Sequence, residues 1–329
     1  MVENQNISSF EQLKKYSIIS VDTGDVKLVK ELKQLDSTTN PTLILKSIND
    51  YPEFLEDAIA YSTKKLNCTD SSNKELLDLI IMKTCVNFGK AILENIDGVV
   101  STEIDARSSF NVEENIKLAK KVIELYEEVG IKKERVLIKL SANWEGIIAA
   151  EQLEKEGIKC NLTLVFSLIQ SAACAEKGIT LISPFVGRVT DFVQKKTQIT
   201  YKPSEEPGVL LVKDIHDYYR CFSYKTLVMA ASLRNTSQGY ELAGVDKLTI
   251  PPAILQSMKS DNTQIEKKLN DEDFKNKKIL KLEINEDSFK KQIESDEVSS
   301  TLLKKGIESF SNDIISLEKI IKEKLSKLN

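Results

Sequence analysis

Hydrophobic and polar positions alternate between two patterns along most of this chain. Short runs rich in β-branched residues are each followed by a polar or glycine-marked turn and then by a longer segment with apolar residues at helical spacing. The runs predicted as strands are Ile18–Thr23, Thr38–Leu45, Val99–Asp105, Val136–Ser141, Cys160–Phe166, Thr180–Val186, Thr226–Ser232 and Lys247–Ile250. The helical segments between them include Glu53–Leu66, Lys74–Asn95, Val112–Val129, Glu145–Glu156, Leu168–Lys177 and Ile215–Phe222.

This alternation predicts an α/β fold with a parallel sheet, and its eight strands predict a (β/α)8 TIM barrel. An open doubly wound sheet is the alternative. It is disfavoured because neither a G-x-G-x-x-G motif nor a phosphate-binding loop follows any predicted strand. The segment 48–97 is long for one crossover, so we expect two helices in it.

The two ends of the chain lie outside the predicted strands. We expect one barrel domain over residues 1–329, with residues 1–17 as an N-terminal helical lead-in and residues 262–329 as additional C-terminal helices packed on the barrel. A helix lying across the barrel is favoured over a coiled coil, because its apolar stripe is too short for a sustained heptad seam. The stripe consists of Ile307, Phe310, Ile314, Leu317, Ile321 and Leu325.

Composition and charge exclude several classes of protein. The 41% of hydrophobic residues can bury a large core, and the net charge of −4, with acidic and basic residues mixed, forms no basic patch. We therefore expect neither a nucleic-acid partner nor a membrane partner. The N-terminus lacks the apolar core of a signal peptide, and no apolar run approaches the roughly 18–20 residues that span a bilayer, so a cytoplasmic location is predicted.

Cysteine and histidine are too sparse for most metal and nucleophile sites. The five cysteines are odd in number and widely spaced, which indicates reduced thiols rather than a disulfide framework. His216 is the only histidine, so a zinc site or a Ser–His–Asp triad has almost no residues to use. We expect no metal and no cofactor.

Polar side chains interrupt the predicted strands, which is unusual because parallel barrel strands are covered on both faces. Side chains alternate along a strand, so residues of one parity share a face. Such series include Lys139, Asp22 and Glu103, and barrel enzymes assemble their sites from the C-terminal ends of the strands. The other polar residues in these series are Ser20, Thr38, Asn40, Thr42, Ser101, Asp105, Ser141, Asn161, Thr163, Ser183 and Ser232, the last in line with Ala230.

Lys139 carries the chemistry in this hypothesis. An ammonium group inside an apolar strand is unfavourable unless it is paired or neutral, so Lys139 either forms a structural pair with a glutamate or acts as a nucleophile. A desolvated lysine condenses with a ketone to form an imine, which is an electron sink for C–C cleavage without a metal. Two separated carboxylates can divide the acid and base steps of such a cleavage.

Seven segments together resemble transaldolases of the classical, larger-subunit type. They are VDTGD, DSTTNPTLIL, STEIDARSSF, VLIKLSANWEGI, CNLTLVFS, LISPFVGRVTDF and MAASLRN. The resemblance runs from about Val21 to Pro252. It implies reversible transfer of a dihydroxyacetone unit from sedoheptulose 7-phosphate or fructose 6-phosphate to glyceraldehyde 3-phosphate or erythrose 4-phosphate, in the pentose phosphate pathway, and it suggests a homodimer.

The resemblance also implies a role for each matched residue. Lys139 would form the Schiff base, Asp22 would take the C4 hydroxyl proton as the C3–C4 bond breaks, and Glu103 with Thr163 would position the water of imine formation and hydrolysis. The other matched residues are expected to bind the sugar or to support the site. They are Asn40, Thr38, Ser101, Asn161, Ser183 and Phe185.

The substrate phosphate would be held by Arg188, with Arg234 and Ser232. Arginine suits this role because its planar fork offers bidentate, permanently charged donors.

Other functions remain open at this point. The chain is alternatively a related Schiff-base sugar-phosphate aldolase that releases its three-carbon fragment, or a non-catalytic barrel that only binds sugar phosphates. A divalent-metal enzyme with Asp22 and Glu103 as ligands is disfavoured because Lys139 on the same face would repel the ion.

Overall fold

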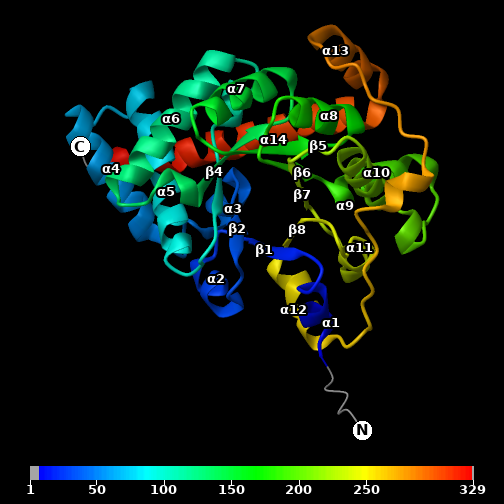
Figure 1. The fold of residues 1–329 in the computed structure, drawn as a ribbon. Coiled ribbons are helices and arrows are strands. Elements are labelled where there is room, and N and C mark those ends of the chain that lie inside the picture. The colour runs from blue at the N-terminus through cyan, green and yellow to red at the C-terminus, as the bar shows by residue number, and fades with distance from the viewer. Residues whose placement is uncertain (1–6, 328–329) are drawn as a thin grey trace.

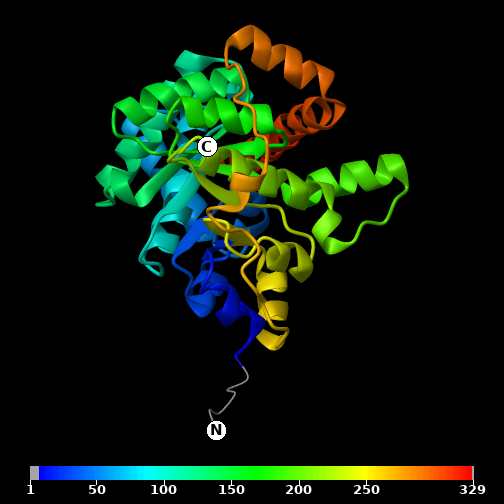
Figure 2. The same ribbon diagram turned by 45° about the vertical axis from the view of Figure 1, so that its right-hand side comes forward.

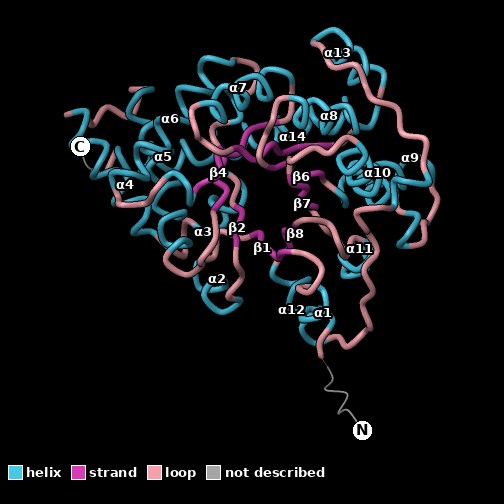
Figure 3. Tube along the Cα trace, in the orientation of Figure 1, coloured by secondary structure: helices cyan, strands magenta, loops and turns pink. Residues whose placement is uncertain are grey.

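The computed structural model describes residues 7–327 and contains a closed barrel of eight parallel strands (Figure 1). Figure 3 shows these strands in magenta at the centre of the molecule. The strands follow one another around the barrel in chain order, and β8 pairs with β1 to close it. The prediction of a (β/α)8 barrel is confirmed. The strands are β1 (Ile18–Asp22), β2 (Asp36–Thr38), β3 (Val100–Glu103), β4 (Val136–Ser141), β5 (Cys160–Val165), β6 (Leu181–Pro184), β7 (Leu227–Ala230) and β8 (Lys247–Ile250).

Helices surround the strands, as the two ribbon views show (Figures 1 and 2). The segment 48–97 holds two of them, α4 and α5, as expected. The α-helices are α1 (Ser9–Leu13), α2 (Val26–Leu32), α3 (Pro41–Ser47), α4 (Pro52–Leu66), α5 (Lys74–Leu93), α6 (Val112–Glu128), α7 (Trp144–Lys155), α8 (Leu168–Glu176), α9 (Val186–Thr197), α10 (Pro207–Cys221), α11 (Thr236–Glu241), α12 (Pro252–Ser260), α13 (Glu286–Ser295) and α14 (Glu297–Leu325). Short 3-10 helices are η1 (Ala106–Ser108), η2 (Lys133–Arg135), η3 (Pro203–Glu205) and η4 (Asp273–Asn276).

The predicted second strand, Thr38–Leu45, is wrong. Strand β2 ends at Thr38, and the apolar run that follows forms helix α3. The Asn40 side chain accepts a hydrogen bond from the Leu43 backbone N–H at 2.9 Å, and Pro41 occupies the first helical turn. This cap and the proline start a helix that the β-prone residues Thr42 to Leu45 conceal.

Among residues 7–327 the apolar core forms four clusters, and two of them define the layers of the barrel. The main apolar cluster packs between the outer face of the barrel and the helices. A small cluster of Leu137, Leu181 and Met229 lies inside the barrel. Leu137 and Leu181 precede Lys139 and Ser183 by two residues in their strands, so this apolar layer forms a floor beneath the polar layer.

Helix α14, red in Figure 1, packs against α3, η1, α5, β5 and α9. Each of the six stripe residues predicted for this helix is buried, which confirms a helix packed on the barrel. The helical part of the C-terminal segment is shorter than predicted, because residues 261–285 carry only η4 before α13 begins.

The predicted N-terminal lead-in contains α1, and its first six residues lie outside the described range, as do residues 328–329. Within residues 7–327, none of the helices has the length and apolarity needed to cross a bilayer.

Candidate active site

A cavity of about 270 Å³ lies inside the ring of strand ends, above the apolar floor. Nine of the thirteen predicted site residues line it: Asp22, Thr38, Asn40, Lys139, Ser183, Phe185, Arg188, Ser232 and Arg234. The other four, Ser101, Glu103, Asn161 and Thr163, are buried in β3 and β5 beside Lys139. The thirteen residues therefore lie in this cavity or in the strands next to it.

Lys139 is buried on strand β4, which pairs with β3 on one side and β5 on the other. Its Nζ lies 3.2 Å from Glu103 Oε2 and donates a hydrogen bond to the Thr39 carbonyl oxygen at 3.2 Å. The alternative of a lysine–glutamate pair is thus present in the structure. Lys139 also lines the cavity, so this pair lies at the cavity wall.

Glu103 faces Lys139 across the register of β3 and β4. Burial raises the pKa of the Glu103 carboxyl above its ordinary value, while the charge of Lys139 and its hydrogen bond oppose this shift. A carboxyl group with a raised pKa exchanges protons closer to neutral pH, so Glu103 is suited to act as both an acid and a base.

Asp22 ends strand β1 beside Thr38 of β2, and the two residues are partners in the strand register. The Thr38 hydroxyl donates to Asp22 Oδ1 at 2.8 Å. Burial raises the pKa of Asp22, against the lowering effects of Lys139, of this hydrogen bond and of Arg188. Asp22 is therefore a stronger base than an aspartate in water.

A chain of hydrogen bonds connects three other predicted residues beneath the cavity. The Ser183 hydroxyl donates to Asn161 Oδ1 at 2.7 Å, and Asn161 Nδ2 donates to the Ser101 hydroxyl at 3.0 Å. The chain fixes the orientation of the Asn161 amide, so that Ser183 reaches the cavity in a defined position.

Thr163 differs from these three residues. Its hydroxyl is buried and has no hydrogen-bond partner among residues 7–327. It lies at an irregularity of β5, where the register with β6 shifts between Leu162 and Val165 and Leu164 has φ +59°. An unpartnered buried hydroxyl is uncommon, and here it provides a free polar group next to the Lys139 strand.

Arg188 follows β6, on the first turn of α9. Its guanidinium carbon lies 5.0 Å from the ring centroid of Phe185 and 5.8 Å from that of Phe310. No hydrogen bond or ion pair joins the guanidinium to another residue within 7–327. Burial and the nearby Arg234 lower the pKa of Arg188, which means that the folded protein disfavours its charge. The charge of a bound anion would oppose this shift by favouring the charged guanidinium.

Arg234 and Ser232 complete this end of the cavity. Arg234 Nε pairs with Asp191 at 2.8 Å, and its Nη1 donates to the Ser232 hydroxyl at 3.2 Å. The predicted parity of Ser232 with Ala230 is wrong. Ala230 points outward into the main core, while Ser232 lies beyond the end of β7 with φ +61° and reaches the cavity from the loop.

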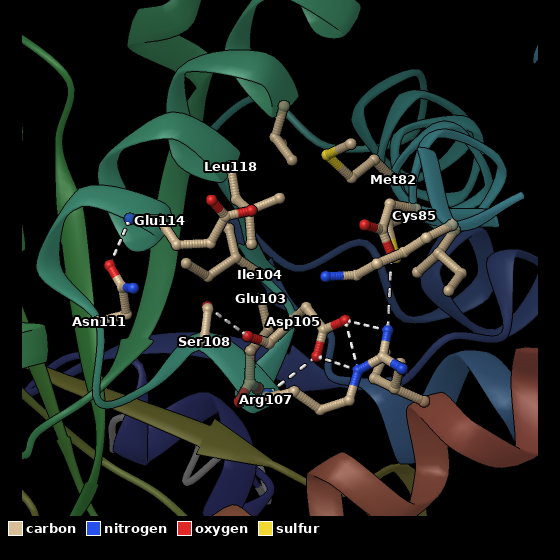
Figure 4. A pocket seen from close by; sticks show the side chains of 15 residues that line it. Met82, Cys85, Glu103, Ile104, Asp105, Arg107, Ser108, Asn111, Glu114 and Leu118 are labelled. Atoms are coloured by element: carbon tan, nitrogen blue, oxygen red, sulfur yellow. Dashed lines mark hydrogen bonds and ion pairs between the residues drawn. The ribbon is translucent and has the colours of Figure 1, made fainter. Parts of the chain in front are cut away.

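Asp105 was grouped with Glu103 by parity, and both residues line a second cavity of about 300 Å³. Asp105 reaches this cavity from beyond the end of β3. In Figure 4 its carboxylate faces Arg107, and the two form an ion pair at 2.6 Å. Arg107 also pairs with Glu318 of α14 at 2.9 Å, so these ion pairs join the segment after β3 to α14.

Comparisons with known proteins identify the family of this chain. Residues 19–321 match the family model described as transaldolase/fructose-6-phosphate aldolase. The chain belongs to this family. A probable transaldolase of Dictyostelium discoideum is 45% identical over 322 residues, which cover 97% of this chain and 99% of the relative. A transaldolase of Shewanella amazonensis is 48% identical over 264 residues, covering 80% and 82% of the two chains. A transaldolase of Methylobacillus flagellatus is 47% identical over 264 residues, with the same coverage.

Sequence reasoning about the family segments missed several residues that line the cavity. They are Leu43, Lys46, Ala231, Thr249, Pro251 and Phe310. Thr249 had a usable signal, since it is a polar residue inside a short apolar strand. Phe310 had none, because a phenylalanine in an apolar helical stripe gives no indication that it reaches a site about 170 positions away from Lys139.

Proposed function

We propose that this chain is a transaldolase that moves a dihydroxyacetone unit from a ketose phosphate to an aldose phosphate through a Schiff base on Lys139. The donor is sedoheptulose 7-phosphate or fructose 6-phosphate, and the acceptor is glyceraldehyde 3-phosphate or erythrose 4-phosphate. One observation carries the proposal: a buried lysine lines the same cavity as a carboxylate and an unpaired arginine. Family membership supports the assignment.

The reaction begins with attack of the neutral Lys139 amine on the C2 carbonyl of the donor. Glu103, 3.2 Å from the lysine nitrogen, is placed to take a proton from the Lys139 ammonium before the attack. A second proton moves from the attacking nitrogen to the carbonyl oxygen, and Glu103 then returns its proton to the carbinolamine hydroxyl, which leaves as water. The free hydroxyl of Thr163 is suited to hold this water. The product is a protonated imine.

Cleavage follows at the C3–C4 bond. Asp22 takes the proton of the C4 hydroxyl, C4 becomes an aldehyde carbon, and the bonding electrons move into the imine to form an enamine. The aldose phosphate leaves while the three-carbon unit stays bound to Lys139. An acceptor aldehyde then enters, the enamine attacks it, and the same steps run in reverse.

Arg188 is proposed to bind the phosphate, with Arg234 and Ser232. Its unpaired fork lies between two phenyl rings, which hold it in place without occupying its donors.

A second candidate is a Schiff-base aldolase that releases its three-carbon unit, because the matching family model includes fructose-6-phosphate aldolase. The two functions differ in their need for an acceptor. Incubation with fructose 6-phosphate alone should give little turnover, and erythrose 4-phosphate should start it. Steady release of dihydroxyacetone without an acceptor would support the aldolase instead.

The direct test of the mechanism is borohydride reduction in the presence of fructose 6-phosphate, followed by peptide mass mapping. The adduct is expected on the peptide that contains Lys139, and Lys139→Met should abolish it. Lys83→Met is the matched control, because Lys83 is also a buried lysine but lies on α5, where it pairs with Asp57 at 3.7 Å. An adduct that survives Lys139→Met would rule out the proposed Schiff base.

We also propose that the enzyme is a cytoplasmic homodimer that uses the C-terminal helices as its interface. Helix α14 leaves Ile315 52% exposed, which favours a contact surface there. Light scattering should give twice the chain mass of 37.0 kDa, and Ile315→Lys should shift this value toward one chain. A wild-type mass of one chain would contradict the dimer.

A further inference from the structure

Thr249 is a polar residue in the interior of the barrel to which the proposed mechanism gives no role. It is the third residue of β8 and is 3% exposed, yet it lines the cavity. Its Oγ1 lies 2.7 Å from Thr38 Oγ1, and Thr38 Oγ1 lies 2.8 Å from Asp22 Oδ1. Strand β1 pairs with both β2 and β8, so closure of the barrel brings Thr249 next to Thr38.

The direction of these hydrogen bonds follows from the number of protons. An ionised carboxylate only accepts hydrogen bonds, so the single hydroxyl proton of Thr38 points to Asp22. Thr38 then has only lone pairs to offer its other neighbour, and the proton between the two threonines must come from Thr249. The two hydrogen bonds therefore form a directed chain from Thr249 through Thr38 to Asp22.

This chain of hydrogen bonds leaves one oxygen of the Asp22 carboxylate available. Oδ1 accepts the Thr38 proton, whereas Oδ2 accepts no hydrogen bond from residues 7–327. A carboxylate fixed through one oxygen presents the other to the cavity in a defined position, as a general base requires.

We propose that Thr249 is a positioning residue for the reaction: by donating to Thr38 it commits the Thr38 proton to Asp22 and so holds that carboxylate ionised and oriented. This inference rests on the proposed function, because it assumes that Asp22 is the base of C3–C4 cleavage. Hydrogen bonds in series strengthen one another, so loss of the outer bond weakens the inner one.

The test uses Thr249→Val, which keeps the shape of the side chain and removes its hydroxyl. We expect kcat to fall about three- to tenfold, the effect of one hydrogen bond, with little change in KM. The acidic limb of the kcat/KM profile should move to higher pH, because hydrogen bonds to a carboxylate lower its pKa and their loss raises it. Thr249→Ser should restore both values, and Thr249→Ala gives the same readout if the valine variant does not fold.

Thr102→Val is the matched control. Thr102 is also a buried strand threonine that shares a hydrogen bond with another hydroxyl, that of Tyr126 at 2.6 Å, but it lies on the outer face of β3. It should lower stability and leave the pH profile unchanged. An equal pH shift in both variants, or an unchanged profile and kcat in Thr249→Val, would overturn the inference.

A double variant tests whether Thr249 acts through Thr38. In a Thr38→Val background, Thr249→Val should have no further effect on the pH profile, and a full additional shift would contradict the chain. Borohydride trapping on Lys139 separates this inference from the proposed function. Trapping and transfer by the wild type with no effect of Thr249→Val refutes only the inference, whereas a wild type that neither traps nor transfers refutes the function itself.

Discussion

Substitution of Arg188 should change the stability of the protein as well as its binding of phosphate. Arg188→Met removes the charge and keeps an unbranched chain between the two phenyl rings. Burial and Arg234 lower the pKa of Arg188, so its charged form is destabilising in the folded protein at neutral pH, where the unfolded arginine is also charged. The variant should therefore have a higher Tm than the wild type in the absence of anions.

Inorganic phosphate should reverse this difference in Tm between the wild type and Arg188→Met. A ligand that binds only the folded state adds about 2.7 kcal/mol of stability at 100 times its Kd. The unfolding entropy of about 2.1 cal/mol/K per residue amounts, for 329 residues, to roughly 0.7 kcal/mol/K. The wild type should thus gain about 4 °C in Tm at that concentration of inorganic phosphate. The Tm of Arg188→Met should rise much less, because this variant lacks the unpaired guanidinium group.

The assay is thermal unfolding followed by circular dichroism across a phosphate titration, with chloride at matched ionic strength. Lys195→Met is the control, since Lys195 is an exposed residue of the same helix α9 and the substitution removes the same charge. The control should respond to phosphate like the wild type. The reasoning fails if Arg188→Met keeps the full phosphate shift, or if Lys195→Met loses it.

Three further predictions concern the base and the packing of α14. Asp22→Asn keeps an acceptor for Thr38 but removes a carboxylate whose pKa is raised by burial, so at neutral pH the variant should have a higher urea midpoint than the wild type. It should still trap substrate on Lys139 but fail to cleave it, and a lower urea midpoint would contradict this reasoning. In the wild type, the acidic limb of kcat/KM should lie above the ordinary aspartate pKa of about 3.9, because activity needs ionised Asp22, and a limb below that pH would count against this role. Gly306→Ala would place a Cβ 2.7 Å from Leu164 Cδ2 and should destabilise the protein by about 1–3 kcal/mol in urea unfolding. Lys304→Ala, at an exposed position of the same helix, should have little effect, and equal urea midpoints for the two variants would exclude this close packing.

Much of the barrel and the centre of its site could be predicted from local patterns. The predicted strands Val136–Ser141 and Lys247–Ile250 have the bounds seen in the structure, because β-branched residues and the turns around them agree there. Lys139, Asp22 and Glu103 could be found because an ionisable residue in a strand covered on both faces is conspicuous in any sequence.

Errors arose where a local pattern competes with a helix cap or continues past the end of a strand. The β-prone run after Asn40 belongs to α3, since the cap satisfies the backbone where a strand would have continued. Parity failed for Ser232 because this residue lies beyond the last paired residue of β7, where side chains no longer alternate.

The sequence by itself determined which side chains are available and which share a face of their strand, because both are properties of neighbouring residues. Only the tertiary structure decided which of them meet. Thr249 reaches Thr38 because the barrel closes β8 onto β1, and Phe310 reaches Arg188 because α14 packs across the strand ends. Such contacts join residues more than one hundred positions apart, and nothing in the local pattern of either partner specifies the other.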